Sequence, residues 1–148
     1  MGRAKLKWDP FDQNDPGPCI KVVVSNSQDV IAGWRALGLH CPEPRAVTAL
    51  IDTGASTTVI SKVFARHCKL FQTGEGSLFT TLAGLAVCGE HAGAISFPGT
   101  NLQSFDSHRI ISGDFVGERH YSCLIGRDVL RNWHIAFDGH RKLVVIED

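Results

Sequence analysis

Residues 49–56 read Ala49-Leu50-Ile51-Asp52-Thr53-Gly54-Ala55-Ser56, a motif that stands above the rest of the sequence. It places a carboxylate, Asp52, at the end of an apolar β-type run, where an unpaired buried charge would be costly. The glycine at position 54 allows a tight turn and a close approach by another backbone or a ligand. Thr53 and Ser56 add hydroxyls that can hydrogen-bond to the turn or to the carboxylate. The motif therefore indicates a functional loop rather than a purely structural one.

A second motif follows later in the chain and reads Tyr121-Ser122-Cys123-Leu124-Ile125-Gly126-Arg127-Asp128-Val129-Leu130. It has the pattern of a buried strand, a glycine and a short helix over Asp128–Trp133. Asp128 is the acidic residue that suits a helix N-terminus. We interpret Arg127 and Asp128 as structural residues that begin this helix and hold the loop around Asp52.

The rest of the chain consists mainly of short β-type runs between turn signals, which is typical of an all-β sandwich or barrel. The expected strands are Ile20–Val24, Ala46–Ile51, Thr57–Ile60, Ser77–Leu82, Leu85–Cys88, Ala92–Phe97, Arg109–Phe115, Tyr121–Ile125, Ile135–Phe137 and Leu143–Glu147. A helix is also expected over Ser61–His67, which begins with an N-cap type of residue. The segment Gln28–Pro44 fits either a wide loop or one helical turn.

The chain has 148 residues, enough for one ordinary domain. We expect this domain to span residues 19–148. Residues 1–18 are polar and rich in turn signals, so we interpret them as an N-terminal arm that is ordered only if something holds it down.

Composition narrows the possible partners. Fifteen basic and fifteen acidic side chains cancel to a formal net charge of zero, so the basic excess that is typical of nucleic-acid binders is missing. A net charge of zero does little to keep molecules apart, which is compatible with self-association. The apolar runs are much shorter than the roughly 20 residues of a membrane-spanning helix, and no signal peptide is expected. We therefore expect neither nucleic acid nor a membrane as a partner.

The five cysteines are an odd number at scattered spacings, without a Cys-x-x-Cys pair. This pattern favours reduced, mostly buried thiols in a cytoplasmic protein over a disulfide framework.

Together the two motifs resemble those of the retropepsin family, the single-domain aspartic proteases of retroviruses and their cellular and bacterial relatives. The residues from Asp52 to Ser56 match the family's Asp-Thr-Gly-Ala active-site loop, and Leu124–Leu130 matches its hydrophobic-hydrophobic-Gly-Arg turn before the C-terminal helix. Thr80–Ala86 takes the place of the family's glycine-bearing flap. The similarity extends from about Cys19 to the C-terminus.

This resemblance implies an all-β, closed acid-protease barrel with one short C-terminal helix, assembled as a homodimer. It also implies peptide-bond hydrolysis by a water held between two aspartates, with no metal or cofactor. Only one Asp-Thr-Gly occurs in the chain, so Asp52 and its twin from a second copy have to supply the dyad. Two carboxylates held close together share one proton, so that one acts as general base and the other as general acid.

The resemblance also assigns roles to neighbouring residues. Thr53 would interlock with its twin from the second copy. Gly54 would offer its carbonyl to an extended peptide or protein substrate, which is bound by strand-like backbone hydrogen bonds. Other substrate contacts would come from Ala55, Leu82, Gly84 and Leu85. Support would come from Thr53, Gly54 and Ser56 in the loop and from Gly126, Arg127 and Asp128 beside it. One departure is Ser56, because viral members usually have an acidic residue there that pairs with the arginine; Arg127 therefore needs another partner.

Other interpretations stay open. Asp52 could simply cap a turn, and a non-catalytic or autoinhibited homodimer of the same fold could bind extended peptide. The intact Asp-Thr-Gly favours the enzyme, because a binding module has no need of it. The histidines and cysteines do not form a recognisable zinc ligand set, and a serine hydrolase would be expected to have a Gly-x-Ser-x-Gly motif, which the chain lacks.

Overall fold

The computed structural model of the chain describes residues 1–81, 84–115 and 120–148. Strands dominate this part of the chain and its helices are few and short, which confirms the expected all-β class. In chain order the elements are β1 (Arg3–Lys7), β2 (Cys19–Ser25), α1 (Gln28–Ala36), β3 (Arg45–Ile51), β4 (Val59–Ser61), α2 (Lys62–His67), β5 (Phe71–Thr81), β6 (Gly84–Ser96), β7 (Phe105–Gly113), β8 (Cys123–Ile125), α3 (Arg127–Leu130), β9 (His134–Asp138) and β10 (Leu143–Glu147).

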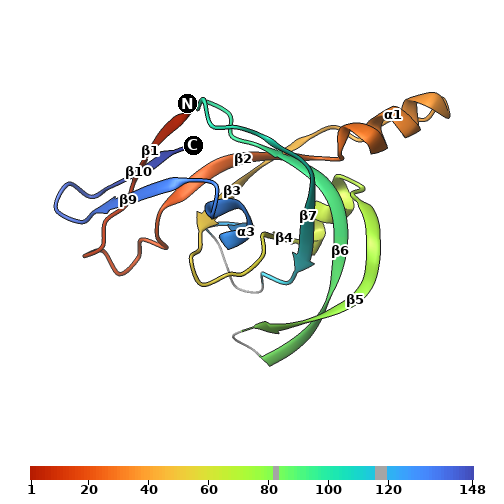
Figure 1. Cartoon of the computed structure of the whole chain (residues 1–148). Helices are drawn as coiled ribbons and strands as arrows, with labels where there is room; N and C mark the ends of the chain where they lie inside the picture. Colours follow the sequence, from red (N-terminus) through yellow and green to blue (C-terminus); the bar gives the residue numbers. More distant parts are fainter. Residues whose placement is uncertain (82–83, 116–119) are drawn as a thin grey trace.

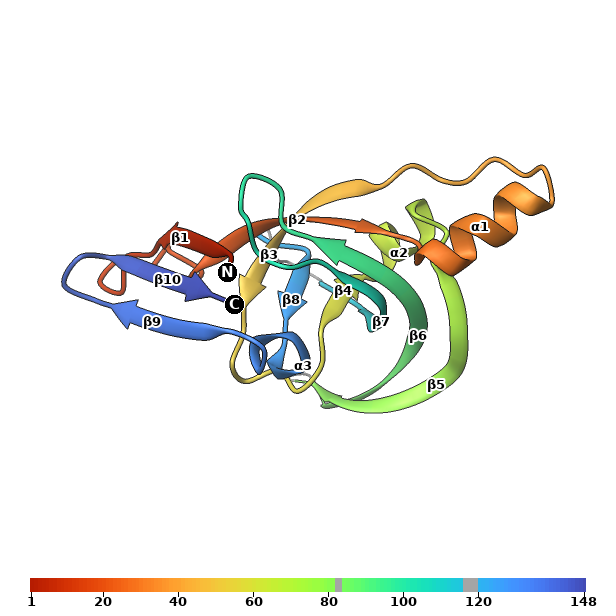
Figure 2. The same cartoon turned by 45° about the horizontal axis from the view of Figure 1, so that its top comes forward.

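The main sheet has the strand order β2-β3-β8-β4-β7-β6-β5, and β2 pairs a second time, with β6. Its strands alternate between buried and exposed side chains, as a sheet with one face on a core requires. In β2, for example, Ile20, Val22 and Val24 are buried while Lys21 between them is exposed. β5 and β6 form a long, curved hairpin that wraps around the body (Figures 1 and 2).

The short strand β8 lies inside the main sheet, between β3 and β4. It pairs in parallel with β3, where Ile51 is opposite Ile125, and antiparallel with β4, where Ile60 is opposite Cys123. Ile60 and Ile125 are both fully buried. The chain that leaves β3 therefore has to pass around the end of β8 before it can enter β4, and this passage contains Asp52.

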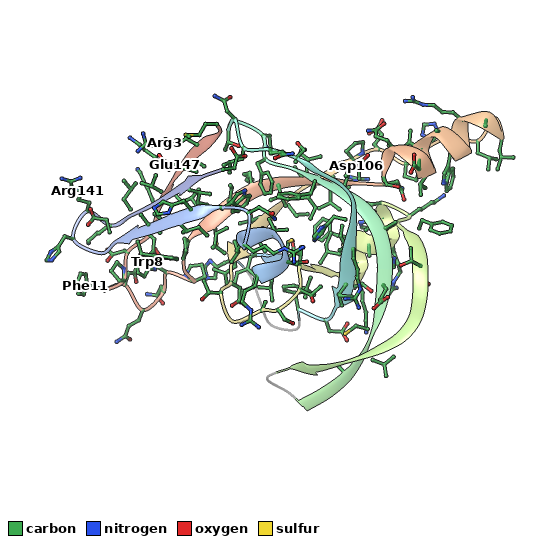
Figure 3. The ribbon with its side chains drawn as sticks, in the orientation of Figure 1. Arg3, Trp8, Phe11, Asp106, Arg141 and Glu147 are labelled. Carbon is green, nitrogen blue, oxygen red and sulfur yellow. The ribbon has the colours of Figure 1, made fainter. Side chains whose placement is uncertain are left out.

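A second sheet, in the order β1-β10-β9, lies at the opposite end of the molecule from α1 (Figure 1). Residues 3–7 of the N-terminal arm form β1 and pair antiparallel with residues 143–147. Arg3 and Glu147 form an ion pair of 3.1 Å across these strands, and both side chains are labelled in Figure 3. Trp8 packs edge-on against Phe137, with ring centroids 5.7 Å apart. β10 therefore supplies the partner that this part of the arm needs in order to be ordered.

Several elements differ from the expected ones. Gln28–Ala36 is a helix of nine residues, longer than the single turn considered for this segment, and the Ser27 side chain caps it by accepting from the Val30 N–H. The two short strands expected over 85–88 and 92–97 form one strand, β6, because β5 and β7 pair along its two sides. The expected C-terminal helix begins one residue earlier, at Arg127. No helix in the described part of the chain is long and apolar enough to cross a membrane.

The attachment of β1 can be tested with Leu6→Ala. Leu6 is buried in the core, so we expect its truncation to lower the free energy of unfolding by about 2–3 kcal/mol, measured by urea denaturation. Lys5→Ala changes the exposed neighbour on the same strand and should stay within about 0.5 kcal/mol of wild type. Equal stability of the two variants would contradict the packing of β1 on the core.

Candidate functional site

Asp52 is the first residue after β3, and its backbone is fixed from the side of β8. Its N–H donates to the Ile125 carbonyl over 3.0 Å, which continues the β3–β8 ladder by one hydrogen bond. The preceding residue, Ile51, donates to the Pro18 carbonyl over 2.9 Å. The position of Asp52 is therefore set by two neighbouring segments of the chain.

The Asp52 carboxylate is half-buried and is held by its own turn. Its Oδ1 accepts from the Gly54 N–H over 2.8 Å and from the Ala55 N–H over 3.2 Å. The side-chain oxygen Oδ2 has no hydrogen-bond partner among the described residues. A Cβ at position 54 would lie 3.1 Å from Oδ1, so glycine suits this close approach. One carboxylate oxygen is thus oriented by the backbone while the other is left for an incoming group.

The loop 52–58 and the turn after β8 are joined by hydrogen bonds that backbone N–H groups of the turn donate to the loop. The Arg127 N–H donates to the Ala55 carbonyl over 2.9 Å, and the Gly126 N–H donates to Thr58 Oγ1 over 3.2 Å. A Cβ on Gly126 would lie 2.6 Å from the backbone C and O atoms of Thr57. Only a residue without a side chain fits against the loop at this point.

The Asp128 carboxylate holds the end of the loop at Thr58 by hydrogen bonds. Its Oδ2 accepts from the Thr58 N–H over 3.0 Å and its Oδ1 accepts from the Thr58 hydroxyl over 2.9 Å. His108 Nε2, on β7, lies 2.8 Å from the same Oδ2. Partial burial acts to raise the pKa of Asp128, but the hydrogen bonds from His108 and Thr58 outweigh it and hold the pKa below its ordinary value. Asp128 therefore links the loop, α3 and β7 through an ionised carboxylate.

The structure brings part of the predicted site together. Hydrogen bonds join the loop 52–58 to the turn after β8, and the predicted site residues in these two segments are Asp52, Thr53, Gly54, Ala55, Ser56, Gly126, Arg127 and Asp128. The side chains of Thr53 and Ser56 are exposed. The Arg127 side chain is also exposed and forms no ion pair with a described residue.

Two of the predicted flap residues, Gly84 and Leu85, lie in the described part of the β5–β6 hairpin. Leu82 is outside the described residues. Gly84 and Leu85 begin β6, opposite Thr81 and Thr80 of β5. In Figures 1 and 2 this end of the hairpin curves towards the side of the body where the loop 52–58 lies.

Sequence reasoning missed two supporting residues. Thr58 is fully buried, and its place at the end of the loop 52–58 was a local signal for a supporting role. His108 carried no such signal, because its contact with Asp128 connects β7 with α3, 20 residues further along the chain.

Comparison with solved structures shows the fold. The chain is similar to a retropepsin-like aspartic protease from Rickettsia conorii, with a TM-score of 0.56 and 13% sequence identity, over 99% of this chain and 91% of that chain. No protein-family model and no curated protein matches the sequence. At this identity the likeness concerns the fold, which agrees with the retropepsin-like fold that the sequence motifs implied.

The close fit at Gly126 predicts a large effect of Gly126→Ala. The added methyl group meets backbone atoms of Thr57 that have no freedom to move aside, so we expect a loss of about 1–3 kcal/mol in the free energy of unfolding. Gly33→Ala is the matched control, because Gly33 lies in α1 with open space around it; there alanine should stabilise the helix by about 0.5–1 kcal/mol. Wild-type stability of Gly126→Ala would contradict this account of the loop.

The lowered pKa of Asp128 predicts a pH effect on stability. A carboxyl group with a lowered pKa in the folded state stabilises the fold above its unfolded pKa, and this contribution is lost as the pH falls through the folded pKa. Between about pH 5 and pH 2 the free energy of unfolding of wild type should therefore fall more steeply than that of Asp128→Asn. Urea denaturation at a series of pH values measures both slopes, with the exposed Asp12→Asn as control. Parallel slopes for wild type and Asp128→Asn would count against the role of Asp128.

Proposed function

We propose that this chain is an aspartic endopeptidase that hydrolyses peptide bonds as a homodimer, with Asp52 of each subunit in a shared dyad. The observation that carries this proposal is the Asp52 turn, in which backbone N–H groups orient one carboxylate oxygen and leave the other without a described partner. The likeness of the fold to a retropepsin-like aspartic protease supports the same assignment.

A second copy is required because one chain has only one Asp-Thr-Gly. A two-fold symmetric contact is the commonest form of homo-oligomer and brings identical residues together across its axis. The exposed Thr53 and Gly54 suit such a contact, since they extend beyond the half-buried Asp52. Arg127, exposed and without an ion pair to a described residue, would gain a partner in the dimer or in the substrate. The second pairing of β2, with β6, supports a closed acid-protease barrel in each subunit.

The chemistry would follow from two close carboxylates. Because both cannot ionise easily at short distance, the pair holds one proton over part of the acid range. The ionised Asp52 takes a proton from a bound water, whose oxygen attacks the scissile carbonyl carbon, while the protonated twin gives its proton to the carbonyl oxygen. The first aspartate then passes its proton to the amide nitrogen, the C–N bond breaks and the amine leaves, and the twin takes a proton back from the hydroxyl that becomes part of the new carboxyl group. The hydrogen bonds from Gly54 and Ala55 to Oδ1 hold the carboxylate in place during this exchange.

The substrate would lie as an extended segment between the loop 52–58 and the β5–β6 hairpins. The substrate would be bound by strand-like backbone hydrogen bonds and recognised by pockets for alternate side chains. On this proposal Gly54 and Ala55 form the floor, and Leu82, Gly84 and Leu85 come from the hairpin above. The odd number of cysteines and the lack of a Cys-x-x-Cys pair support action in the reducing cytoplasm.

The proposal is tested by cleavage of a diverse peptide library from about pH 3.5 to about pH 7.5. Wild type should cleave with a bell-shaped acid profile, and Asp52→Asn should lower kcat/KM about 100-fold or more because it removes the general acid–base pair. The control is Asp12→Asn, which changes an exposed aspartate outside any Thr-Gly context and should keep full activity. Cleavage that survives Asp52→Asn would refute the aspartic mechanism. A wild-type dimer that binds peptides without cutting them would favour the non-catalytic or autoinhibited alternative.

A further inference from the structure

A hollow of about 370 Å³ lies among α2, β5, β6 and β7, apart from the loop 52–58. Its lining shares no residue with the loop or with the turn 126–128. The polar residues that line it come from α2 and the segment after it, from the start of β5 (Gln72), from the middle of β6 (His91) and from the end of β7 (Ser112). The proposed protease chemistry uses none of them, so the hollow needs an explanation of its own.

Three cations gather on one wall of this hollow. Lys62 and Arg66 lie four residues apart, on one face of α2, and Lys69 follows the end of the helix. The carboxylate of Asp114 lies 3.0 Å from Lys62 Nζ. Within the described part of the chain, Arg66 and Lys69 have no ion-pair partner. The wall therefore carries an excess of positive charge, although the whole chain has a net charge of zero.

Lys69 adopts a backbone conformation that lysine seldom has. Its φ is 46°, in the left-handed region, at the position after the Cys68 cap of α2. Glycine is the usual residue at this point, because its lack of a Cβ avoids the steric cost. Here the chain has a lysine instead, and its side chain borders the hollow.

The floor of the hollow is a buried polar pair. His91 and Ser112 are 9% and 5% exposed, and His91 Nε2 lies 3.0 Å from Ser112 Oγ. On its other side, His91 Nδ1 lies 3.4 Å from the Leu70 carbonyl oxygen. The two contacts of the ring hold His91 in place and keep the Ser112 hydroxyl at the bottom of the hollow.

Gly89 keeps this pair accessible. A Cβ at position 89 would lie 2.9 Å from Ser112 Oγ and 3.1 Å from His91 Nε2. Any side chain there would cover the polar pair on the side that borders the hollow. The glycine thus leaves a gap directly over the buried hydroxyl, with the cations on the wall beside it.

We propose that this hollow is a binding site for a doubly charged tetrahedral oxyanion, namely a phosphate group. Arg66, Lys62 and Lys69 supply charge-assisted donors for its oxygens. The Ser112 hydroxyl, which lies beside His91 at the floor, adds an uncharged polar contact for the phosphate. The volume has room for a phosphate together with part of the molecule that carries it. The phosphate belongs either to a small phosphorylated compound or to a phosphorylated segment of a protein.

Phosphate titrations of the whole chain test the site. The melting temperature should rise saturably with inorganic phosphate but not with sodium chloride at the same ionic strength, and calorimetry gives the Kd. Arg66→Gln combined with Lys69→Gln removes two exposed cations and should raise the Kd about tenfold or more. The matched control, Arg35→Gln combined with Lys21→Gln, removes two exposed cations away from the hollow and should leave the Kd unchanged.

Gly89→Ala tests the floor without changing any charge, and it should also raise the Kd for inorganic phosphate. Phosphoserine and a short phosphoserine peptide then distinguish the two sources. Tighter binding of the peptide assigns a protein segment, and equal binding assigns a small compound. The proposal is overturned if wild type shows no saturable response, or if either the double variant or Gly89→Ala binds phosphate as tightly as wild type. None of these outcomes depends on peptidase activity, so the proposal stands or falls independently of the proposed function.

Discussion

The hydrogen bonds on the two sides of β8 are the constraint on which the rest of the site depends. Because β8 pairs with β3 on one side and with β4 on the other, the chain between these strands has to cross the end of β8. A crossing loop carries backbone polar groups that need partners. It finds them in the turn that leaves β8, where the loop and residues 125–127 exchange hydrogen bonds. The topology of the sheet therefore places Asp52 and fixes its backbone at the same time.

Asp128 completes this arrangement from the other end of the loop. A partly buried carboxylate is costly unless it is hydrogen-bonded, and Thr58 and His108 supply the donors. The loop is thus anchored at Asp52 by the β3–β8 ladder and at Thr58 by an ionised side chain. Such support on both sides is what a catalytic carboxylate needs, because small displacements of a reacting group cost much of its effect.

The parts that the sequence predicted well are those with local signals. The loop 52–58 was located by an apolar run followed by Asp-Thr-Gly. The turn 126–128, which is hydrogen-bonded to this loop, was located by a second apolar run followed by Gly-Arg-Asp. β1 escaped prediction because its alternating side chains make a strand only when β10 pairs with them. The full length of α1 was hidden by Gly33 inside its apolar pattern, although the Ser27 cap was a usable signal. β6 was divided in two because Gly89 and the polar residues after it interrupt its apolar pattern, while the ladders to its neighbours continue past them.

The distribution of charge in the folded protein also depends on contacts between residues that are distant along the chain, which the sequence alone does not show. A net charge of zero describes the average of the chain, and it argues against partners that read the field of a whole molecule, such as nucleic acid. Folding redistributes the charges: it places His108 on Asp128 and Lys62 on Asp114, and it collects Arg66 and Lys69 beside a buried hydroxyl. Recognition of a small anion depends on this local arrangement, because screening at physiological ionic strength confines electrostatic attraction between exposed groups to about 8 Å. A neutral chain can therefore present a strongly cationic hollow, and composition alone gives no sign of it.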